Sequence, residues 1–124
     1  MKYLCLIIGL LCTLTFAQSF SKCEKIAANA VLNSDYVKNL TMDWDNLIKQ
    51  NGGTSYGLQK NESVNGVFRF VLVQHYPERD YNANWFTLDV KNNQYFEESM
   101  VDPEFNTFFK LNSKDLLKLK QCLK

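Results

Sequence analysis

His75 is the residue whose type most readily suggests chemistry, because the chain contains no other histidine. Glu78 and Asp80 follow within five residues, and a histidine that is oriented by a carboxylate can act as a general base. The opposing interpretation is a partly buried histidine at a strand end, beside a charged loop in solvent. Because no motif ties a serine or cysteine nucleophile to His75, we predict no catalytic residue and keep an enzyme that uses His75 only as an alternative.

The sequence predicts neither a metal site nor a cofactor. One histidine with nearby carboxylates lacks the repeated ligand spacing of zinc sites. The acidic pairs Asp43/Asp45 and Glu97/Glu98 lack the alternating oxygen ligands and the glycine of a calcium loop. We interpret both pairs as solvated faces.

The segment from Tyr76 to Trp85, which reads YPERDYNANW, is the best candidate for a binding surface. Rigid aromatic side chains mixed with arginine provide contact area at low entropy cost in protein interfaces and sugar sites. We therefore predict that Tyr76, Arg79, Tyr81 and Trp85 contact a partner. The alternative is that these aromatic side chains fold back and cover a sheet edge, and only their exposure can decide between the two.

Residues 1–17 have the three parts of a secretory signal peptide. Lys2 supplies the positive start, and residues 4–14 form a short apolar core. Thr15 and Ala17 then place small side chains at the third-last and last positions before a cut. We expect cleavage after residue 17, which leaves a secreted or periplasmic protein.

Two kinds of membrane anchor compete with this interpretation. A transmembrane helix needs about 20 apolar residues, more than this run provides. A lipid anchor on Cys12 would require a small side chain where Leu11 stands. We expect no stable membrane anchor after cleavage, and residues 18–124 have the length of a single domain.

The charge of the mature chain argues against anionic partners. Loss of Lys2 reduces the 14 basic side chains by one, so that they equal the 13 acidic ones. A neutral domain has no net field with which to attract phosphates, so we expect no nucleic acid partner. The nine Phe, six Tyr and two Trp favour a packed globular fold over disorder.

Of the four cysteines, only Cys23 and Cys122 remain after cleavage. Two thiols without a third partner usually pair in an oxidising compartment, so we predict a Cys23–Cys122 disulfide within the chain. Two free thiols, or a bridge between chains, are the alternatives.

Helical patterns occur at both ends of the mature chain. Ser21 and Glu24 have the spacing of a capping box. Apolar residues then recur at helical spacing in two stretches: Cys23, Ile26, Ala27, Ala30 and Val31, and then Val37, Leu40, Trp44, Leu47 and Ile48. The Asn33-Ser34-Asp35 cluster either separates two helices or bends one. At the C-terminus, Ser113 is the predicted N-cap of a helix with an apolar stripe at Leu116, Leu119 and Leu123.

Between these helices the apolar period changes to two. We predict strands from Ser55, over Val67–Tyr76, over Trp85–Lys91 and over Gln94–Glu98, with a further strand within Phe105–Leu111. The predicted connections are a turn at Asn61–Gly66, a loop at Pro77–Asn84 and a tight turn at Asn92-Asn93. Apolar residues on both faces of Val67–Tyr76 indicate a central strand that is covered on two sides. The fold class is therefore α+β: N-terminal helices, a four- to five-stranded antiparallel meander and a C-terminal helix.

The segment Glu62-Ser63-Val64-Asn65-Gly66 resembles the Q-x-V-x-G hairpin of the cystatins, and the order helix, strand, hairpin, strand is similar. The resemblance covers about a fifth of the chain. Glu62 stands in place of the glutamine, and Asn84-Trp85 in place of Pro-Trp. The predicted C-terminal helix has no counterpart in that family. The resemblance implies binding through an exposed hairpin.

These features predict a non-catalytic extracytoplasmic binding protein whose partner is another protein, in the manner of a small inhibitor or an immunity factor. One alternative is a carrier of a small apolar ligand, held between sheet and helices by Phe68, Phe70, Phe86, Leu88 and Trp44. A packed core would use the same residues. The other alternative is the enzyme that uses His75.

Overall fold

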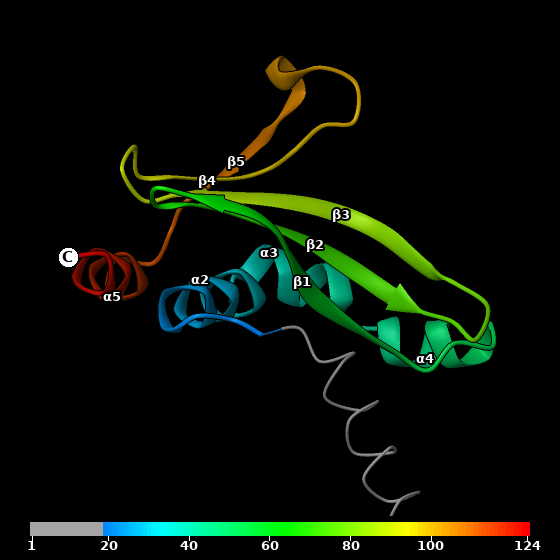
Figure 1. Cartoon of the computed structure of the whole chain (residues 1–124). Helices are drawn as coiled ribbons and strands as arrows, with labels where there is room; N and C mark the ends of the chain where they lie inside the picture. The colour runs from blue at the N-terminus through cyan, green and yellow to red at the C-terminus, as the bar shows by residue number, and fades with distance from the viewer. Residues whose placement is uncertain (1–18) are drawn as a thin grey trace, which may run out of the picture.

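A computed structural model describes residues 19–124, which form helices packed against one antiparallel sheet (Figure 1). The elements follow in the order α2 (Lys22–Leu32), α3 (Asp35–Thr41), α4 (Trp44–Gln50), β1 (Ser55–Val64), β2 (Val67–His75), β3 (Asp80–Asp89), β4 (Gln94–Glu97), the 3-10 helix η1 (Pro103–Phe105), β5 (Thr107–Phe109) and α5 (Ser113–Cys122). Each strand pairs with the next in sequence, in the order β1-β2-β3-β4-β5. The predicted α+β class is confirmed, and the meander has five strands.

The capping box at the start of α2 is confirmed. The Ser21 hydroxyl accepts a hydrogen bond from the Glu24 N–H at 3.2 Å, and Glu24 Oε1 accepts one from the Ser21 N–H at 2.8 Å. Three buried alanines on this helix allow its backbone to approach the sheet closely: Ala27, Ala28 and Ala30. The cluster after Leu32 separates α2 from α3, which begins at Asp35.

The second predicted helical stretch is divided into α3 and α4 at Met42-Asp43. Because α3 and α4 are separate helices, their apolar faces do not form one continuous stripe. The prediction that Leu47 lies on the apolar face is wrong, since Leu47 is half-exposed. Helix α4 ends next to the sheet: a Cβ atom on Gly53 would lie 2.8 Å from the carbonyl oxygen of His75. Glycine is therefore required where α4 leads into β1.

The sheet buries its inner face against the helices. Opposite one another on neighbouring strands lie Phe70 and Phe86, Phe68 and Leu88, and Leu88 and Tyr95. These side chains are at most 4% exposed and belong to one core with α2 and Leu119. Figure 1 shows α2, α3, α4 and α5 on this side of the sheet.

The outer face of β2 is buried at two positions, and the predicted central place of this strand in the sheet is confirmed. Val71 and Val73 are at most 9% exposed, although no described helix packs on that side. The cross-strand neighbours of Val71 are Gln59 and Trp85, and side chains opposite one another on adjacent strands are in reach of contact. Neighbouring strands, and not a second helical layer, therefore shield this face.

Several predicted boundaries are wrong by a few residues. Strand β1 continues through a bulge to Val64, so the turn is only Asn65-Gly66, with positive φ at both residues. Strand β3 begins at Asp80, inside the predicted loop, and carries a register shift opposite Leu72/Val73. The N-cap of α5 is Asn112, whose side chain accepts from the Lys114 N–H at 2.8 Å, and not Ser113.

The predicted disulfide between Cys23 and Cys122 is confirmed. It joins α2 to α5, with the two Cα atoms 5.6 Å apart and 99 positions apart in sequence. Among residues 19–124, no helix has the length and apolar character needed to cross a membrane. The predicted signal peptide lies outside the described residues.

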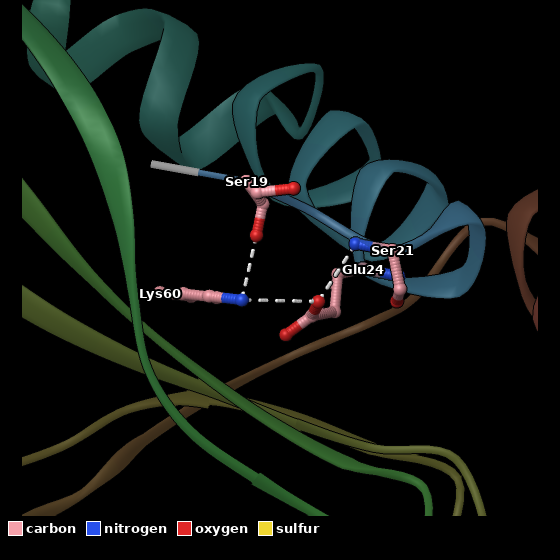
Figure 2. A network of polar contacts seen from close by, with 4 residues as sticks. All are labelled: Ser19, Ser21, Glu24 and Lys60. Carbon is pink, nitrogen blue, oxygen red and sulfur yellow. Dashed lines mark hydrogen bonds and ion pairs between the residues drawn. The ribbon is translucent and has the colours of Figure 1, made fainter. Parts of the chain in front are cut away.

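A polar network ties the start of α2 to β1 (Figure 2). The Lys60 ammonium donates to the Ser19 carbonyl oxygen at 2.6 Å and lies 3.5 Å from Glu24 Oε1. The pKa of Glu24 lies below its ordinary value of 4.5, mainly because the Ser21 N–H stabilises the carboxylate. Burial opposes this shift, and the Ser21 hydroxyl and Lys60 add to it.

Breaking the disulfide should destabilise the domain strongly. Cys23→Ala with Cys122→Ala is expected to lower the free energy of unfolding by about 4 to 5 kcal/mol, because the unfolded chain regains the entropy lost on closing a loop of roughly 100 residues. Urea unfolding of the double variant and of the oxidised parent measures the difference. Equal stabilities of the two proteins would contradict the prediction.

Glu24→Gln should reduce stability at pH 7 by about 0.5 to 1.5 kcal/mol, because the charge-assisted half of the capping box is lost. A carboxylate whose pKa is lowered on folding stabilises the fold above its unfolded pKa, and that contribution disappears as pH falls through the folded value. The parent should therefore lose stability below about pH 4.5 more steeply than the variant. Urea unfolding from pH 7 to pH 3 checks this, with Glu62→Gln as the control at an exposed carboxylate.

Candidate functional site

A surface hollow of about 550 Å³ lies where the end of α4 meets the loop between β2 and β3. Three of its lining residues are predicted binding residues: Tyr76, Arg79 and Tyr81. The others are Asn51, Gly52, Gln74, Pro77 and Glu78. We call this hollow the loop site.

Backbone and side-chain hydrogen bonds hold the loop site in shape. The Tyr76 N–H donates to the Arg79 carbonyl oxygen at 3.2 Å, which closes a tight turn over residues 76–79. The Tyr76 hydroxyl donates to Gln74 Oε1 at 2.9 Å. Because these bonds already order the loop, binding of a partner would cost little conformational entropy.

The exposure of the loop decides between the two interpretations of its aromatic side chains. Tyr81 is 58% exposed, and Arg79 is exposed as well, so these side chains do not fold back onto a sheet edge. Tyr76 is partly buried and forms part of the wall. The loop site thus combines two phenol rings with a guanidinium group and a carboxylate from Glu78, a mixture suited to polar partners.

Trp85 lies apart from the other predicted binding residues. It is on β3 opposite Val71, partly buried, and does not line the loop site. Sequence reasoning missed Asn51, Gly52 and Gln74 as lining residues. The Asn51-Gly52-Gly53 signal did predict the end of α4, but nothing in it indicated that this end meets the β2–β3 loop.

His75 forms a pair with Asp80, and its Nδ1 atom lies 2.9 Å from Asp80 Oδ1. Ser55 lies directly opposite His75 on β1, so a serine, a histidine and an aspartate form one row across three strands. These residue types occur together in acyl-transfer enzymes. His75 and Asp80 line neither the loop site nor the two hollows described next, and Ser55 lines only the third of these hollows, so the three side chains share no hollow in which a substrate could meet them.

A second hollow, of about 880 Å³, lies between α3, β5 and the start of α5. The Ser34 hydroxyl donates to the Val31 carbonyl oxygen at 2.6 Å and is 2.9 Å from the Tyr95 hydroxyl, which therefore donates to it. Tyr36 stacks on Phe109 with ring centroids 4.3 Å apart.

A third hollow, of about 580 Å³, lies beside Tyr56 on β1.

The tyrosines of the second hollow resist ionisation. Burial is the main reason that the pKa of Tyr95 is raised to about 12, with a smaller contribution from the negative charge of Glu97. Burial also raises the pKa of Tyr36, whose hydroxyl donates to Glu97 Oε1 at 3.0 Å. Asn84 donates to the other oxygen of the same carboxylate at 2.6 Å. At neutral pH both tyrosines therefore keep their protons and act as structural hydrogen-bond donors.

The residues proposed to line a cavity for an apolar ligand are packed. Phe68, Phe70, Phe86 and Leu88 belong to the buried core, and Trp44 packs against it with its ring in an edge contact to Tyr56. None of the five lines any of these three hollows.

In the region from residue 19 onward, no group of three or more histidine, cysteine, aspartate or glutamate side chains could hold a metal ion.

The Glu62–Gly66 hairpin is exposed from Glu62 to Asn65. Its tip lies close to the C-terminal helix, since a Cβ atom on Gly66 would be 3.3 Å from a methyl group of Leu123, the C-cap of α5. No protein-family model, no curated protein and no solved structure matches the chain.

Tyr95→Phe should lower the free energy of unfolding at pH 7 by about 0.5 to 1.5 kcal/mol, because the hydrogen bond to Ser34 is lost. A tyrosine whose pKa is raised on folding stabilises the fold below its unfolded pKa of about 10, and this contribution disappears as pH rises towards 12. Between pH 10 and pH 12 the variant should therefore lose less stability than the parent. Chemical unfolding at both pH values measures this, and Tyr81→Phe, at an exposed position, should behave as the parent does.

Proposed function

We propose that the chain is a non-catalytic extracytoplasmic binding domain whose partner is another protein, in the manner of a small inhibitor or an immunity factor. The observation that carries this proposal is the loop site. It brings Tyr76, Arg79 and Tyr81 together around an ordered hollow, and Arg79 and Tyr81 are exposed there. Tyrosine and arginine are the residue types that most often dominate binding energy in protein interfaces.

The disulfide supports the extracytoplasmic location. Such bonds form and persist in secreted and periplasmic proteins and are rare where thiols are kept reduced. It also stabilises a small domain for use outside the cell, where its core alone provides limited stability.

The hollow is shallow and lies between a helix end and a loop, which suits a protruding side chain or a peptide segment of a partner. The opposite charges of Arg79 and Glu78 both line it, so a partner with its own paired charges would fit best. Its rim also carries the amides of Asn51 and Gln74, which can donate and accept hydrogen bonds.

Capture of a partner with matched variants tests this function. Immobilised protein should retain a stoichiometric partner from a native extract of its source. Arg79→Ala with Tyr81→Ala should weaken that binding about thirtyfold or more, because it removes two interface anchors. The control variant, Lys91→Ala with Gln94→Ala, changes exposed residues at the β3–β4 turn and should bind as the parent does.

Two results would contradict the proposal. One is the absence of any stoichiometric partner for the parent protein. The other is a partner that the loop variant and the control variant retain equally well, since binding would then use another surface. Circular dichroism and urea unfolding of each variant establish that the fold is retained.

A further inference from the structure

Residues 98–108, which we call the arm, project from the sheet on the side away from the helices. Figure 1 shows η1 at the top of this projection, away from α2 and α5, with β5 leading from it back to β4. The arm carries four large apolar side chains that are 57% to 87% exposed: Met100, Val101, Phe105 and Phe108. Exposed apolar side chains gathered on a projecting segment mark an interaction surface.

The arm is ordered by its own hydrogen bonds. The Asp102 carboxylate accepts from the Glu104 N–H at 3.1 Å and caps η1. The Ser99 N–H donates to the side-chain oxygen of Asn106 at 2.8 Å, which ties the two sides of the arm together. Phe108 also contacts the ring of Phe96, with centroids 4.9 Å apart. The apolar side chains are therefore presented in a fixed arrangement before any partner arrives.

The arm and α5 have opposite charges. The arm contains the exposed carboxylates of Asp102 and Glu104 and no lysine or arginine, while its third acidic side chain, Glu98, lies 3.8 Å from Arg69 of β2. Helix α5 contains three lysines and a single acidic residue, Asp115, and Lys124 follows its C-cap. The lysines are exposed beside two exposed leucines of α5 and its C-cap: Leu117 at 58% and Leu123 at 43%. The two surfaces thus carry opposite charges, and each also exposes apolar side chains that could pack against the other.

We propose that the arm of one molecule binds α5 of a second copy of this chain. The two surfaces cannot meet within one molecule, because the disulfide holds α5 beside α2 while the arm projects from the other side of the sheet. The contact joins different patches of two copies, so the association is head-to-tail. It uses no residue of the loop site, and it stands or falls independently of the proposed function.

Sedimentation equilibrium of the purified, oxidised chain tests the proposal. The average mass should rise with protein concentration at low salt. Raising the salt from about 20 mM to about 500 mM should weaken the association about tenfold or more, because exposed charges are then screened. A monomer mass at every concentration and salt would overturn the proposal.

A charge exchange identifies the two surfaces. In the arm variant, Asp102→Asn preserves a capping side chain and Glu104→Lys reverses a charge. In the helix variant, Lys114→Glu and Lys118→Glu reverse two charges of α5. Each variant alone should associate about tenfold more weakly than the parent, and an equimolar mixture should recover association, because each altered surface then meets its opposite.

Phe105→Ser should also weaken association, and Met42→Ser provides the matched control, because Met42 is 73% exposed on the helical side of the molecule. The proposal is overturned if the mixture of charge variants stays monomeric. It is also overturned if either charge variant alone associates as the parent does, or if the arm binds an added basic protein such as cytochrome c while the chain itself remains a monomer. Near-UV circular dichroism confirms that all variants are folded.

Discussion

The covalent bond between Cys23 and Cys122 determines where both ends of the described domain lie. It fixes α5 against α2, and α2 in turn packs its buried alanines against the sheet. Helix α5 has ten residues, of which only Leu119 is fully buried. Without the bond, this one side chain and a short connection to the sheet would have to hold the helix in place. The inner face of the sheet is covered at that end because the bond keeps this helix in place.

A second constraint follows from the one-sided arrangement of helices. With the described helices on the inner face, that face is a continuous apolar core, and the outer face is shielded only by cross-strand neighbours such as Trp85. The polar and aromatic groups that could contact a partner lie at the ends of the sheet. The loop site lies at one end of β2, and the arm follows β4 towards β5.

Much of this fold could be predicted from local patterns. The capping box at Ser21 and the meander order both depend on residues close in sequence, and the pairing of Cys23 with Cys122 followed from elimination. The start of β3 at Asp80 could not be predicted in the same way. Its first residues are polar and a register shift interrupts their alternation, so only pairing with β2 makes them a strand.

The candidate site was predictable in part for the same reason. Tyr76, Arg79 and Tyr81 are close in sequence and were identified by residue type, whereas Asn51 lines the loop site only because the end of α4 lies beside the end of β2, which carries Gln74. Tryptophan is a common anchor in protein interfaces, but strand pairing places Trp85 opposite Val71, away from the loop site. Contacts that depend on distant segments carry no local sequence signal.

The closed covalent ring has a consequence for how the molecule responds to a protease. Almost every peptide bond of the described domain lies between the two joined cysteines. A protease that cuts once in the exposed segment from 100 to 105 would produce two pieces that the disulfide still joins into one molecule. A single nick would thus alter the shape of this projection without releasing a fragment, and clearance of the protein would require reduction or a second cut.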